Sequence, residues 1–316
     1  MERRKCFEKM TEYDILHEWA EESVLDRLIK EVKNRNHVIL SGPPGTGKTR
    51  SIDIALSIMA EEISHIETIQ FHPSYSYQDF VEGYAISNGK YEPQKGQLLK
   101  FLDQVQKANS EKIAILVIDE INRGDIPSIF GELMMLLDSG DSREVKTSKF
   151  STKIRLPDNV IILGTMNTAD KSVKQLDLAL RRRFKFLFVK PDYAGLAKWL
   201  NDKGWVIEDF SIDEYVDAVK KINDRIIAYP TLGKNMTLGQ SLFVPRTNQE
   251  TNLELLCDVF NDTILPQLEA YIGFGNKNDL DEILGTPDIR LKLMKGDTIK
   301  KRDVISLIAV LNSAQE

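Results

Sequence analysis

The sequence predicts an α/β domain, with a parallel sheet flanked by helices, followed by a smaller helical domain. Unbroken apolar runs at Ile113–Ile118 and Val160–Leu163 are typical of parallel strands that are buried on both faces. A glycine-rich loop at Gly42–Thr49 lies between an apolar run and a helix-like run. After Pro191 the strand pattern stops, and helical stretches broken by glycine and proline follow.

The composition limits the class of protein. The chain has 316 residues, 42% of them hydrophobic, which is enough for one large domain and a smaller one. A net charge of −6 argues against a surface coated for DNA binding, although it leaves room for a local basic patch. No apolar run is long enough to span a membrane, and no signal peptide is expected. Cys6 and Cys257, and the four histidines, lack metal-site spacing, so we expect a cytoplasmic protein with reduced thiols and no zinc.

Local periodicity predicts the elements in order. Apolar residues recur at helical spacing from Tyr13 to Val32, and this helix leads into a strand at Val38–Leu40. We divide the chain into an N-terminal segment and linker helix (1–34), the α/β domain (35–190) and the helical domain (191–316). The other elements predicted for the α/β domain are a helix at Arg50–Met59, a strand at Ile66–Phe71, a hairpin turning at Asn88-Gly89, a helix at Leu98–Ala108, a helix at Pro127–Leu137 and a hairpin within 143–156.

The glycine-rich loop is the first candidate functional site. Its residues are Gly42-Pro43-Pro44-Gly45-Thr46-Gly47-Lys48-Thr49, which match the P-loop pattern G-x-x-x-x-G-K-T. The glycines allow backbone N–H groups to curl around phosphate oxygens, and the following helix adds partial positive charge at its N-terminus. We expect Lys48 to reach the β- and γ-phosphates and the Thr49 hydroxyl to bind Mg²⁺.

Two further strand ends carry polar residues that match this loop. The strand at Ile113–Ile118 runs into Asp119-Glu120, the Walker B pattern, in which Asp119 holds Mg²⁺ and Glu120 orients or deprotonates the attacking water. The strand that begins at Val160 ends near Asn167, whose amide could donate to a phosphate oxygen and position that water. The alternative for Asn167 is a side chain that caps a turn.

An arginine triplet, Arg181-Arg182-Arg183, follows on a largely helical segment. Such a triplet is compatible with a solvated face or a general anion patch. The functional interpretation is an arginine finger that reaches the γ-phosphate in a neighbouring subunit and stabilises developing charge. The active site would then be shared between subunits.

Taken together, these patterns resemble those of AAA+ ATPases, and more closely the McrB branch of modification-dependent restriction systems. The resemblance covers about residues 35–285. The strings that carry it are Phe71-His72-Pro73-Ser74-Tyr75-Ser76-Tyr77, Phe80-Val81-Glu82-Gly83-Tyr84, Ile118-Asp119-Glu120-Ile121-Asn122-Arg123-Gly124, Met166-Asn167-Thr168-Ala169-Asp170-Lys171-Ser172, Asp177 through Phe184, and Leu265 through Tyr271.

The resemblance implies an AAA+ core with a helical lid, in a motor that hydrolyses GTP and assembles into hexamers with an McrC-like endonuclease subunit. It also implies a sensor at Asn167 and a trans-acting arginine at Arg182 or Arg183, with Arg183 favoured because it precedes Phe184. In this family a DNA-reading domain normally precedes the motor. The roughly 20–35 residues before the first strand are too few for one, so DNA binding is expected through a separate reader domain or subunit.

Some positions depart from the family pattern. Lys171 stands where the family usually has arginine, so a charge remains without the planar bidentate contact. Gly239-Gln240-Ser241-Leu242-Phe243 stands where the family often has Gly-His-Ser-Tyr-Phe, which places any role of that histidine in doubt. Arg246 is a candidate for a second sensor by its location alone.

The nucleotide base is not decided by the residues themselves. Asn276-Lys277-Asn278-Asp279 matches N-K-x-D, which reads guanine in small GTPases, but it lies late in the helical domain, where a solvated loop is the simpler interpretation. The preference for GTP over ATP therefore rests on the resemblance. Two alternatives stay open: a MoxR-like chaperone that uses ATP to remodel proteins, and a nucleotide-loaded scaffold without useful turnover.

Overall fold

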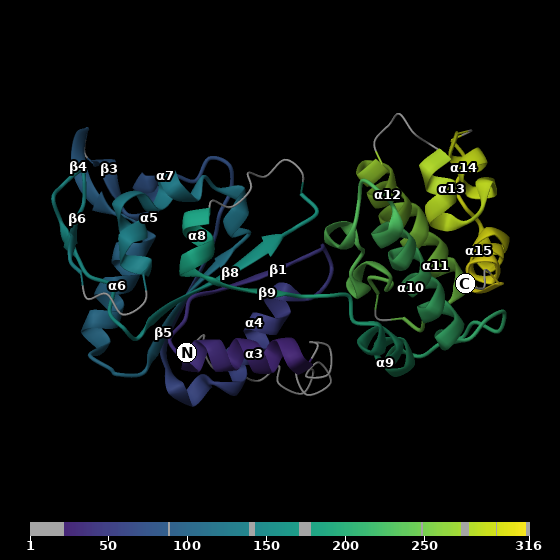
Figure 1. The fold of residues 1–316 in the computed structure, drawn as a ribbon, viewed down its shortest axis with the longest axis horizontal. Helices are drawn as coiled ribbons and strands as arrows, with labels where there is room; N and C mark the ends of the chain where they lie inside the picture. The colour runs from purple at the N-terminus through teal and green to yellow at the C-terminus, as the bar shows by residue number, and fades with distance from the viewer. Residues whose placement is uncertain are drawn as a thin grey trace. The chain divides into compact units, whose positions relative to one another are not determined.

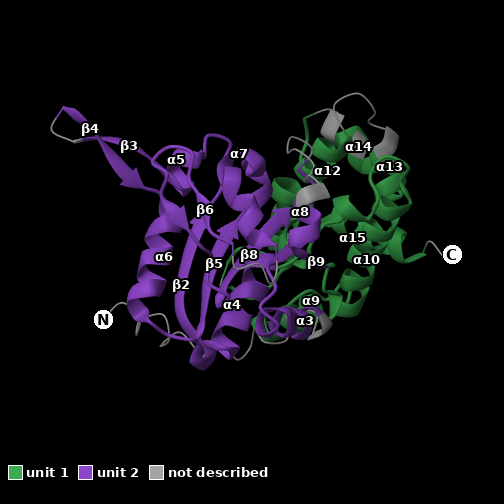
Figure 2. Ribbon diagram, turned by 60° about the vertical axis from the view of Figure 1, so that its left-hand side comes forward, with its two compact units in different colours: residues 1–21, 43–47, 190–316 green, residues 22–42, 48–189 purple. Residues whose placement is uncertain are grey.

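The computed structural model describes residues 22–87, 89–138, 143–170, 178–247, 249–272, 278–294 and 296–313. Its contacts divide the described chain into two compact units, which Figure 2 colours separately. We call residues 22–42 and 48–189 the sheet unit, and residues 43–47 and 190–316 the helical unit. The P-loop tip at 43–47 therefore groups with the helical unit, although it joins a strand and a helix of the sheet unit.

The sheet unit is built on a five-stranded parallel sheet with the order β2-β5-β8-β1-β9. This confirms the predicted α/β class and the buried strands. The strands are β1 (Val38–Gly42), β2 (Ile63–Gln70), β5 (Ile113–Asp119), β8 (Val160–Asn167) and β9 (Lys185–Phe188). The first six residues of β5 and of β8 are buried, as expected for central strands covered on both faces.

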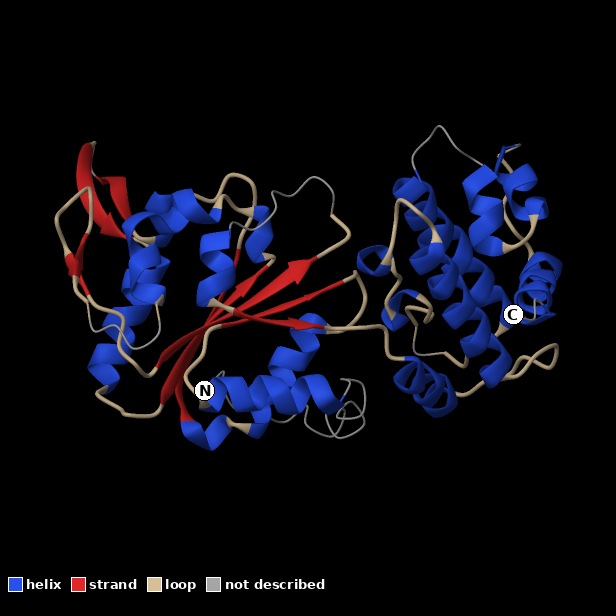
Figure 3. Ribbon diagram, viewed as in Figure 1, coloured by secondary structure: helices blue, strands red, loops and turns tan. Residues whose placement is uncertain are grey.

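Helices cover both faces of this sheet (Figures 1 and 3). α3 (Glu22–Lys33) and α4 (Lys48–Ile58) pack on β1 and on each other, whereas α5 (Tyr77–Phe80), α7 (Ile126–Phe130) and α8 (Leu178–Arg183) lie on the opposite side. α6 (Gln97–Ala108) packs against the edge strand β2. Of the helix predicted at 13–32, the described part is α3; the rest lies outside the described residues.

Two antiparallel hairpins extend the sheet unit. β3 (Glu82–Ser87) pairs with β4 (Lys90–Lys95), and β6 (Val145–Lys146) pairs with β7 (Lys153–Ile154). Both hairpins were predicted, although Asn88 of the first turn lies outside the described residues. The β3–β4 hairpin projects from the rest of the sheet unit (Figure 2).

The predicted helix at Pro127–Leu137 is wrong as a single element. α7 ends at Phe130, and a 3₁₀ helix, η3 (Gly131–Leu137), continues the chain. The break is at Gly131, whose φ of 52° lies outside the right-handed helical region and favours glycine. A side chain at this position would also crowd the ring of Tyr77.

The helical unit contains no strand among its described residues, as predicted for 191–316. Its longest helix, α10, begins at a capping box in which Ser211 and Glu214 satisfy each other's backbone N–H groups, and it packs against α9, α13 and α15. No helix in the described residues is long and apolar enough to cross a membrane. The α-helices here are α9 (Tyr193–Lys203), α10 (Ile212–Ala228), α11 (Leu253–Val259), α12 (Leu265–Ile272), α13 (Asn278–Leu284), α14 (Pro287–Met294) and α15 (Lys301–Ser313).

His37 ties three strands of the sheet together at the start of β1. The backbone N–H of Ile162 donates to His37 Nδ1 at 3.0 Å, and the Lys185 N–H donates to the His37 carbonyl at 2.8 Å. Burial lowers the pKa of His37 to about 4, so the ring is neutral at pH 7 and can accept the Ile162 hydrogen bond.

This arrangement predicts a pH-dependent stability. The folded-state pKa of His37 is depressed, so its contribution is present above the unfolded pKa, near 6.5, and is lost as the pH falls towards 4. Between pH 7 and pH 5 the free energy of unfolding should fall by roughly 2 kcal/mol more in the wild type than in His37→Asn. Asparagine can accept the same N–H and does not titrate. Equal losses in urea unfolding of the two proteins would contradict this role.

Candidate functional site

The strand order brings the predicted strand ends to one edge of the sheet. β8 lies between β5 and β1, and all three run parallel. In this register Gly42 is opposite Asn167, and Ile118 is opposite Gly164. The start of the P-loop, the Walker B pair and the candidate sensor therefore lie at neighbouring carboxyl ends, where α/β proteins place their ligands.

Asp119 is the centre of the polar network at this edge. The Thr49 hydroxyl donates to Asp119 Oδ1 at 3.2 Å, and the Thr165 hydroxyl donates to the same oxygen at 2.5 Å. Thr165 also accepts from the Glu120 N–H at 3.0 Å and is almost fully buried. The two predicted metal ligands therefore lie together. Both the Thr49 hydroxyl and the Asp119 carboxylate are hard oxygen donors of the kind that Mg²⁺ prefers.

Glu120 occupies an unusual backbone position. Its φ of 51° is left-handed, which turns the chain out of β5 and into η2 (Ile121–Arg123). Its carboxylate lies 3.5 Å from Arg123 Nε, while Arg123 Nη2 lies 3.9 Å from Asp170. Burial raises the pKa of Glu120, and Arg123 opposes that shift. A raised pKa makes this carboxylate a better proton acceptor near neutral pH.

Asn167 ends β8 in a turn that the structure describes up to Asp170. Its Oδ1 accepts from the Ala169 N–H at 3.1 Å, which is the turn-capping role considered as the alternative. Asn122 donates to the Asn167 carbonyl at 3.1 Å and links this turn to η2. Because the amide oxygen is used locally, the amide nitrogen is the group that can donate to a phosphate.

Lys48 begins α4 and bends back over the loop. Its Nζ donates to the Gly42 carbonyl at 3.0 Å. Burial lowers the pKa of Lys48 to about 8, against the opposing effect of Glu120 and Asp119. This hydrogen bond places the ammonium at the start of the loop, where a P-loop lysine binds phosphate.

The P-loop tip belongs to the helical unit. Gly45 and Gly47 have φ of 77° and 84°, so each needs the conformational freedom of glycine. The Thr46 hydroxyl donates to the Pro43 carbonyl at 3.0 Å and closes the turn. Within the same unit, the tip is held by hydrogen bonds from residues 239–241.

The arginine triplet lies on α8 and divides by environment. Arg183 donates to Asp138 at 3.0 Å through an ion pair, and its side chain is only 14% exposed. Arg182 is exposed, and the Arg181 guanidinium lies 5.9 Å from the Phe186 ring centre. A finger at Arg183 would have to leave Asp138, so the assignment to Arg183 or Arg182 stays a prediction.

The remaining positions singled out in the sequence also lack a confirmed role. Arg246 is exposed in the helical unit, and its use as a second sensor stays a prediction. Lys171, Asn276 and Lys277 lie outside the described residues. No group of three or more histidine, cysteine, aspartate or glutamate side chains forms a further metal-binding cluster in the described part of the chain.

Sequence reasoning missed the bridging residue Thr165 and the linking residue Asn122. In the sequence Thr165 is a single hydroxyl at the end of an apolar run. In the structure it follows Gly164, the residue opposite Ile118, and therefore lies level with Asp119. The partners of a strand residue depend on strand order, which the local pattern did not provide.

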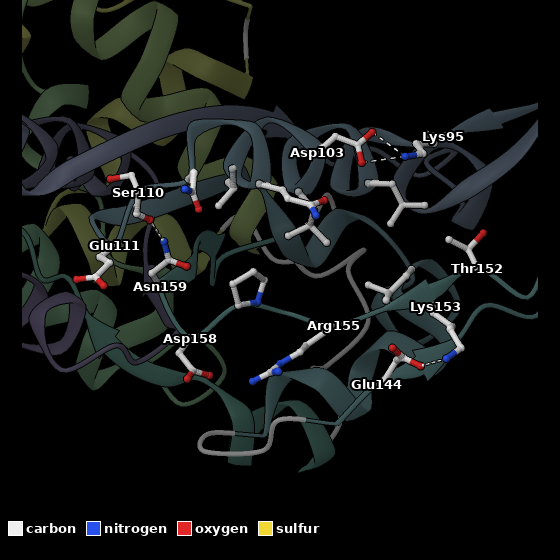
Figure 4. Close-up of a pocket in the computed structure, with 17 residues that line it drawn as sticks. Lys95, Asp103, Ser110, Glu111, Glu144, Thr152, Lys153, Arg155, Asp158 and Asn159 are labelled. Atoms are coloured by element: carbon white, nitrogen blue, oxygen red, sulfur yellow. Dashed lines mark hydrogen bonds and ion pairs between the residues drawn. The ribbon is translucent and has the colours of Figure 1, made fainter.

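A large pocket lies elsewhere on the sheet unit. It has a volume of about 760 Å³ and is lined by residues of α6, β7 and the loops beside them (Figure 4). The ion pairs Lys95–Asp103 and Lys153–Glu144 flank it, whereas no residue of the P-loop, Walker B pair or sensor turn contributes. Its size therefore does not mark the nucleotide site.

Comparisons with known proteins identify the family of this chain. The AAA domain family (dynein-related subfamily) matches residues 37–184, and the McrB alpha-helical lid domain matches residues 214–281. The type IV methyl-directed restriction enzyme EcoKMcrB subunit of Escherichia coli K12 is 32% identical over 263 residues, or 79% of this chain and 57% of that protein. The type II restriction enzyme BsuMI component YdiS of Bacillus subtilis 168 is 28% identical over 197 residues, or 49% of this chain and 57% of that protein.

The chain thus spans little more than half the length of these curated relatives. A solved structure of a putative ATPase from Cytophaga hutchinsonii aligns over 98% of both chains, but at a TM-score of 0.39 and 15% identity it carries no argument. The two matched domains occur in the same order as the two regions predicted from the sequence. The chain belongs to the AAA-type P-loop nucleoside triphosphatases, with an AAA domain and a lid domain of the McrB type.

Proposed function

We propose that this chain is the motor subunit of a restriction system, in which it hydrolyses nucleotide, with GTP favoured over ATP, to drive DNA translocation and cleavage. The observation that carries the hydrolytic part is the network in which Asp119 accepts from Thr49 and Thr165 while Thr165 holds the Glu120 backbone. This network links the P-loop helix to both neighbouring strand ends. The restriction role is supported by the names of the two relatives.

Each residue has a distinct part in the proposed reaction. Lys48 and the P-loop N–H groups bind the phosphates, and Thr49 and Asp119 would hold Mg²⁺, which neutralises charge on the phosphate oxygens. Glu120 orients the attacking water and accepts its proton, and Asn167 positions the water from the other side. Arg183, or Arg182, would arrive from a neighbouring subunit of a homo-oligomeric ring, which we take to be hexameric.

The partners follow from the same proposal. An McrC-like endonuclease subunit would cut the DNA, and a separate reader domain or subunit would recognise it. The match of residues 214–281 to the McrB lid favours this assignment over a MoxR-like chaperone that remodels proteins with ATP. A scaffold without turnover is disfavoured because Lys48, Asp119 and Glu120 are all present, and Thr165 joins Asp119 to the Glu120 backbone.

The first prediction from this proposed function tests hydrolysis and nucleotide choice together. Glu120→Gln should bind nucleotide with wild-type affinity but lower turnover by roughly 10²- to 10⁴-fold, because the amide cannot accept the proton. Phosphate release is measured with GTP and with ATP, with and without the candidate endonuclease partner. Undiminished turnover in the variant would remove Glu120 from the mechanism. Wild-type turnover of ATP at least as fast as that of GTP would overturn the GTP assignment alone.

The second prediction uses the lowered pKa of Lys48. The unliganded lysine loses its proton above about pH 8, whereas the phosphate-bound form needs the charge, so binding takes up a proton at high pH. Between pH 7.5 and pH 9 the Kd for nucleotide should rise by about an order of magnitude. In Lys48→Arg the Kd should stay flat, whatever its absolute value, because arginine does not titrate there. A flat wild-type profile would contradict the shift.

The third prediction concerns the trans-acting arginine. Arg183→Ala and Lys48→Ala should each be inactive alone, but an equimolar mixture should regain activity because one variant supplies the P-loop and the other the arginine. Random assembly places about a quarter of the sites in the productive combination. A parallel mixture with Arg182→Ala identifies which arginine acts. The absence of rescue at every mixing ratio would argue against a finger at that position.

A further inference from the structure

One stretch of the helical unit donates hydrogen bonds to the carbonyl groups of the P-loop tip. We call Leu238–Phe243 the support segment. The Gly239 N–H donates to the Pro44 carbonyl at 2.9 Å, and the Ser241 N–H donates to the Gly45 carbonyl at 3.1 Å. The Gln240 side chain donates through Nε2 to the Thr46 carbonyl at 3.3 Å. Three successive carbonyls of the loop are therefore bound by three successive residues.

The approach is close enough to require glycine. A Cβ on Gly239 would clash with the backbone of Gly45 and Thr46, and a Cβ on Gly45 would clash with Leu242 and Ser241. The two backbones therefore meet directly, as they do where a fold has to fix a loop tightly.

The support segment is in turn fixed by buried side chains of α10. Asn223, with no exposed surface, donates to the Leu238 carbonyl at 2.9 Å and accepts from the Leu238 N–H at 2.7 Å. Tyr215, also fully buried, donates through its hydroxyl to the Phe243 carbonyl at 2.9 Å. Both ends of the segment are thus held by the longest helix of the unit.

Gln240 occupies the centre of this arrangement and is 3% exposed. Its Oε1 accepts from the N–H of Asp192, the residue that caps α9, at 3.1 Å. Its Nε2 is the donor to Thr46. One amide therefore connects the start of α9 to the P-loop tip, and both of its ends have partners in a site where an unpaired group would be costly.

The geometry of the trans peptide links the hydrogen bonds at the P-loop carbonyls to the binding of phosphate. The chain has no cis peptide among its described residues, and in a trans peptide the carbonyl and the following N–H point in opposite directions. Holding the carbonyls of residues 44–46 towards the support segment therefore turns the N–H groups of residues 45–47 the other way. Those N–H groups are the ones that a P-loop offers to phosphate.

We propose that the support segment sets the orientation of the P-loop N–H groups, and that Gln240 is a positioning residue for the triphosphate of the nucleotide. This inference rests on the proposed nucleotide binding. Because Gln240 acts through Thr46 on the phosphate groups, its effect should be the same for GTP and ATP.

The test compares two matched substitutions in the helical unit. Gln240→Glu keeps the acceptor for Asp192 but replaces the donor with a charged oxygen that faces the Thr46 carbonyl. Gln249→Glu makes the same change at an exposed position. Titration with fluorescent GTP and ATP should show about tenfold weaker binding to Gln240→Glu for both nucleotides, and unchanged binding to Gln249→Glu. Circular dichroism and thermal unfolding check that each variant is folded.

A second pair of variants separates positioning from a general structural role and serves if Gln240→Glu does not fold. A neutral imidazole in Gln240→His has one donor and one acceptor, whereas Gln240→Met has neither and keeps about the same side-chain length. At pH 8, Gln240→Met should bind both nucleotides about fivefold more weakly than the wild type, and Gln240→His should recover most of that loss.

The outcomes are distinct. If the wild type binds nucleotide but Gln240→Glu binds equally well, or Gln240→Met binds as tightly as the wild type, or Gln240→His binds no more tightly than Gln240→Met, the inference is overturned and the proposed function stands. A base-dependent loss in Gln240→Glu would also overturn it. If the wild type binds neither nucleotide, the proposed function fails and the inference fails with it.

Discussion

The parallel pairing of β5, β8 and β1 is the constraint on which the site depends. β8 lies between the other two strands, so its end at Asn167 meets both the start of the P-loop and the Walker B pair. A shift of β8 by one residue would turn Thr165 to the opposite face of the sheet and separate it from Asp119. Apolar residues along β8 are almost wholly buried and fix that register. Strand packing thereby sets the position of the polar residues at the strand ends.

Much of this site could be predicted because its parts are local in sequence. The P-loop from Gly42 to Thr49 and the pair Asp119-Glu120 are recognised from adjacent residues, and their strand contexts follow from short apolar runs. The structure confirms those strands and places Thr49 beside Asp119. The predicted helix from 127 to 137 failed because apolar periodicity does not reveal the positive φ at Gly131.

Other parts could not be predicted because they depend on contacts distant in sequence. Thr165 donates a hydrogen bond to Asp119, 46 residues away in the sequence, and Gln240 donates one to Thr46, 194 residues away. Neither side chain has a distinctive local pattern. Gln240 stood out in the sequence only as a departure from a resemblance, whereas the structure gives it two buried hydrogen-bond partners. Threonine and glutamine are versatile in hydrogen bonding, so their roles follow from their partners.

Two sets of hydrogen bonds thus fix the carbonyl groups of the P-loop. Inside the loop, Lys48 binds the Gly42 carbonyl and Thr46 binds the Pro43 carbonyl. From the helical unit, the support segment binds the next three carbonyls. A loop whose carbonyls are held by other donors is preorganised for an anion, because fewer rearrangements accompany binding.

The central claim is that Asp119 and Thr49 hold the metal of a nucleotide bound at the P-loop. The most direct test is electron paramagnetic resonance of Mn²⁺, in place of Mg²⁺, titrated into wild type and Asp119→Asn with GTP. Asparagine keeps the shape of the side chain and can still accept from Thr165, but it lacks the charge that attracts the metal. We predict nucleotide-dependent Mn²⁺ binding in the wild type and a loss of at least about tenfold in Asp119→Asn. Equal binding of the Mn²⁺–nucleotide complex by both proteins would contradict the account.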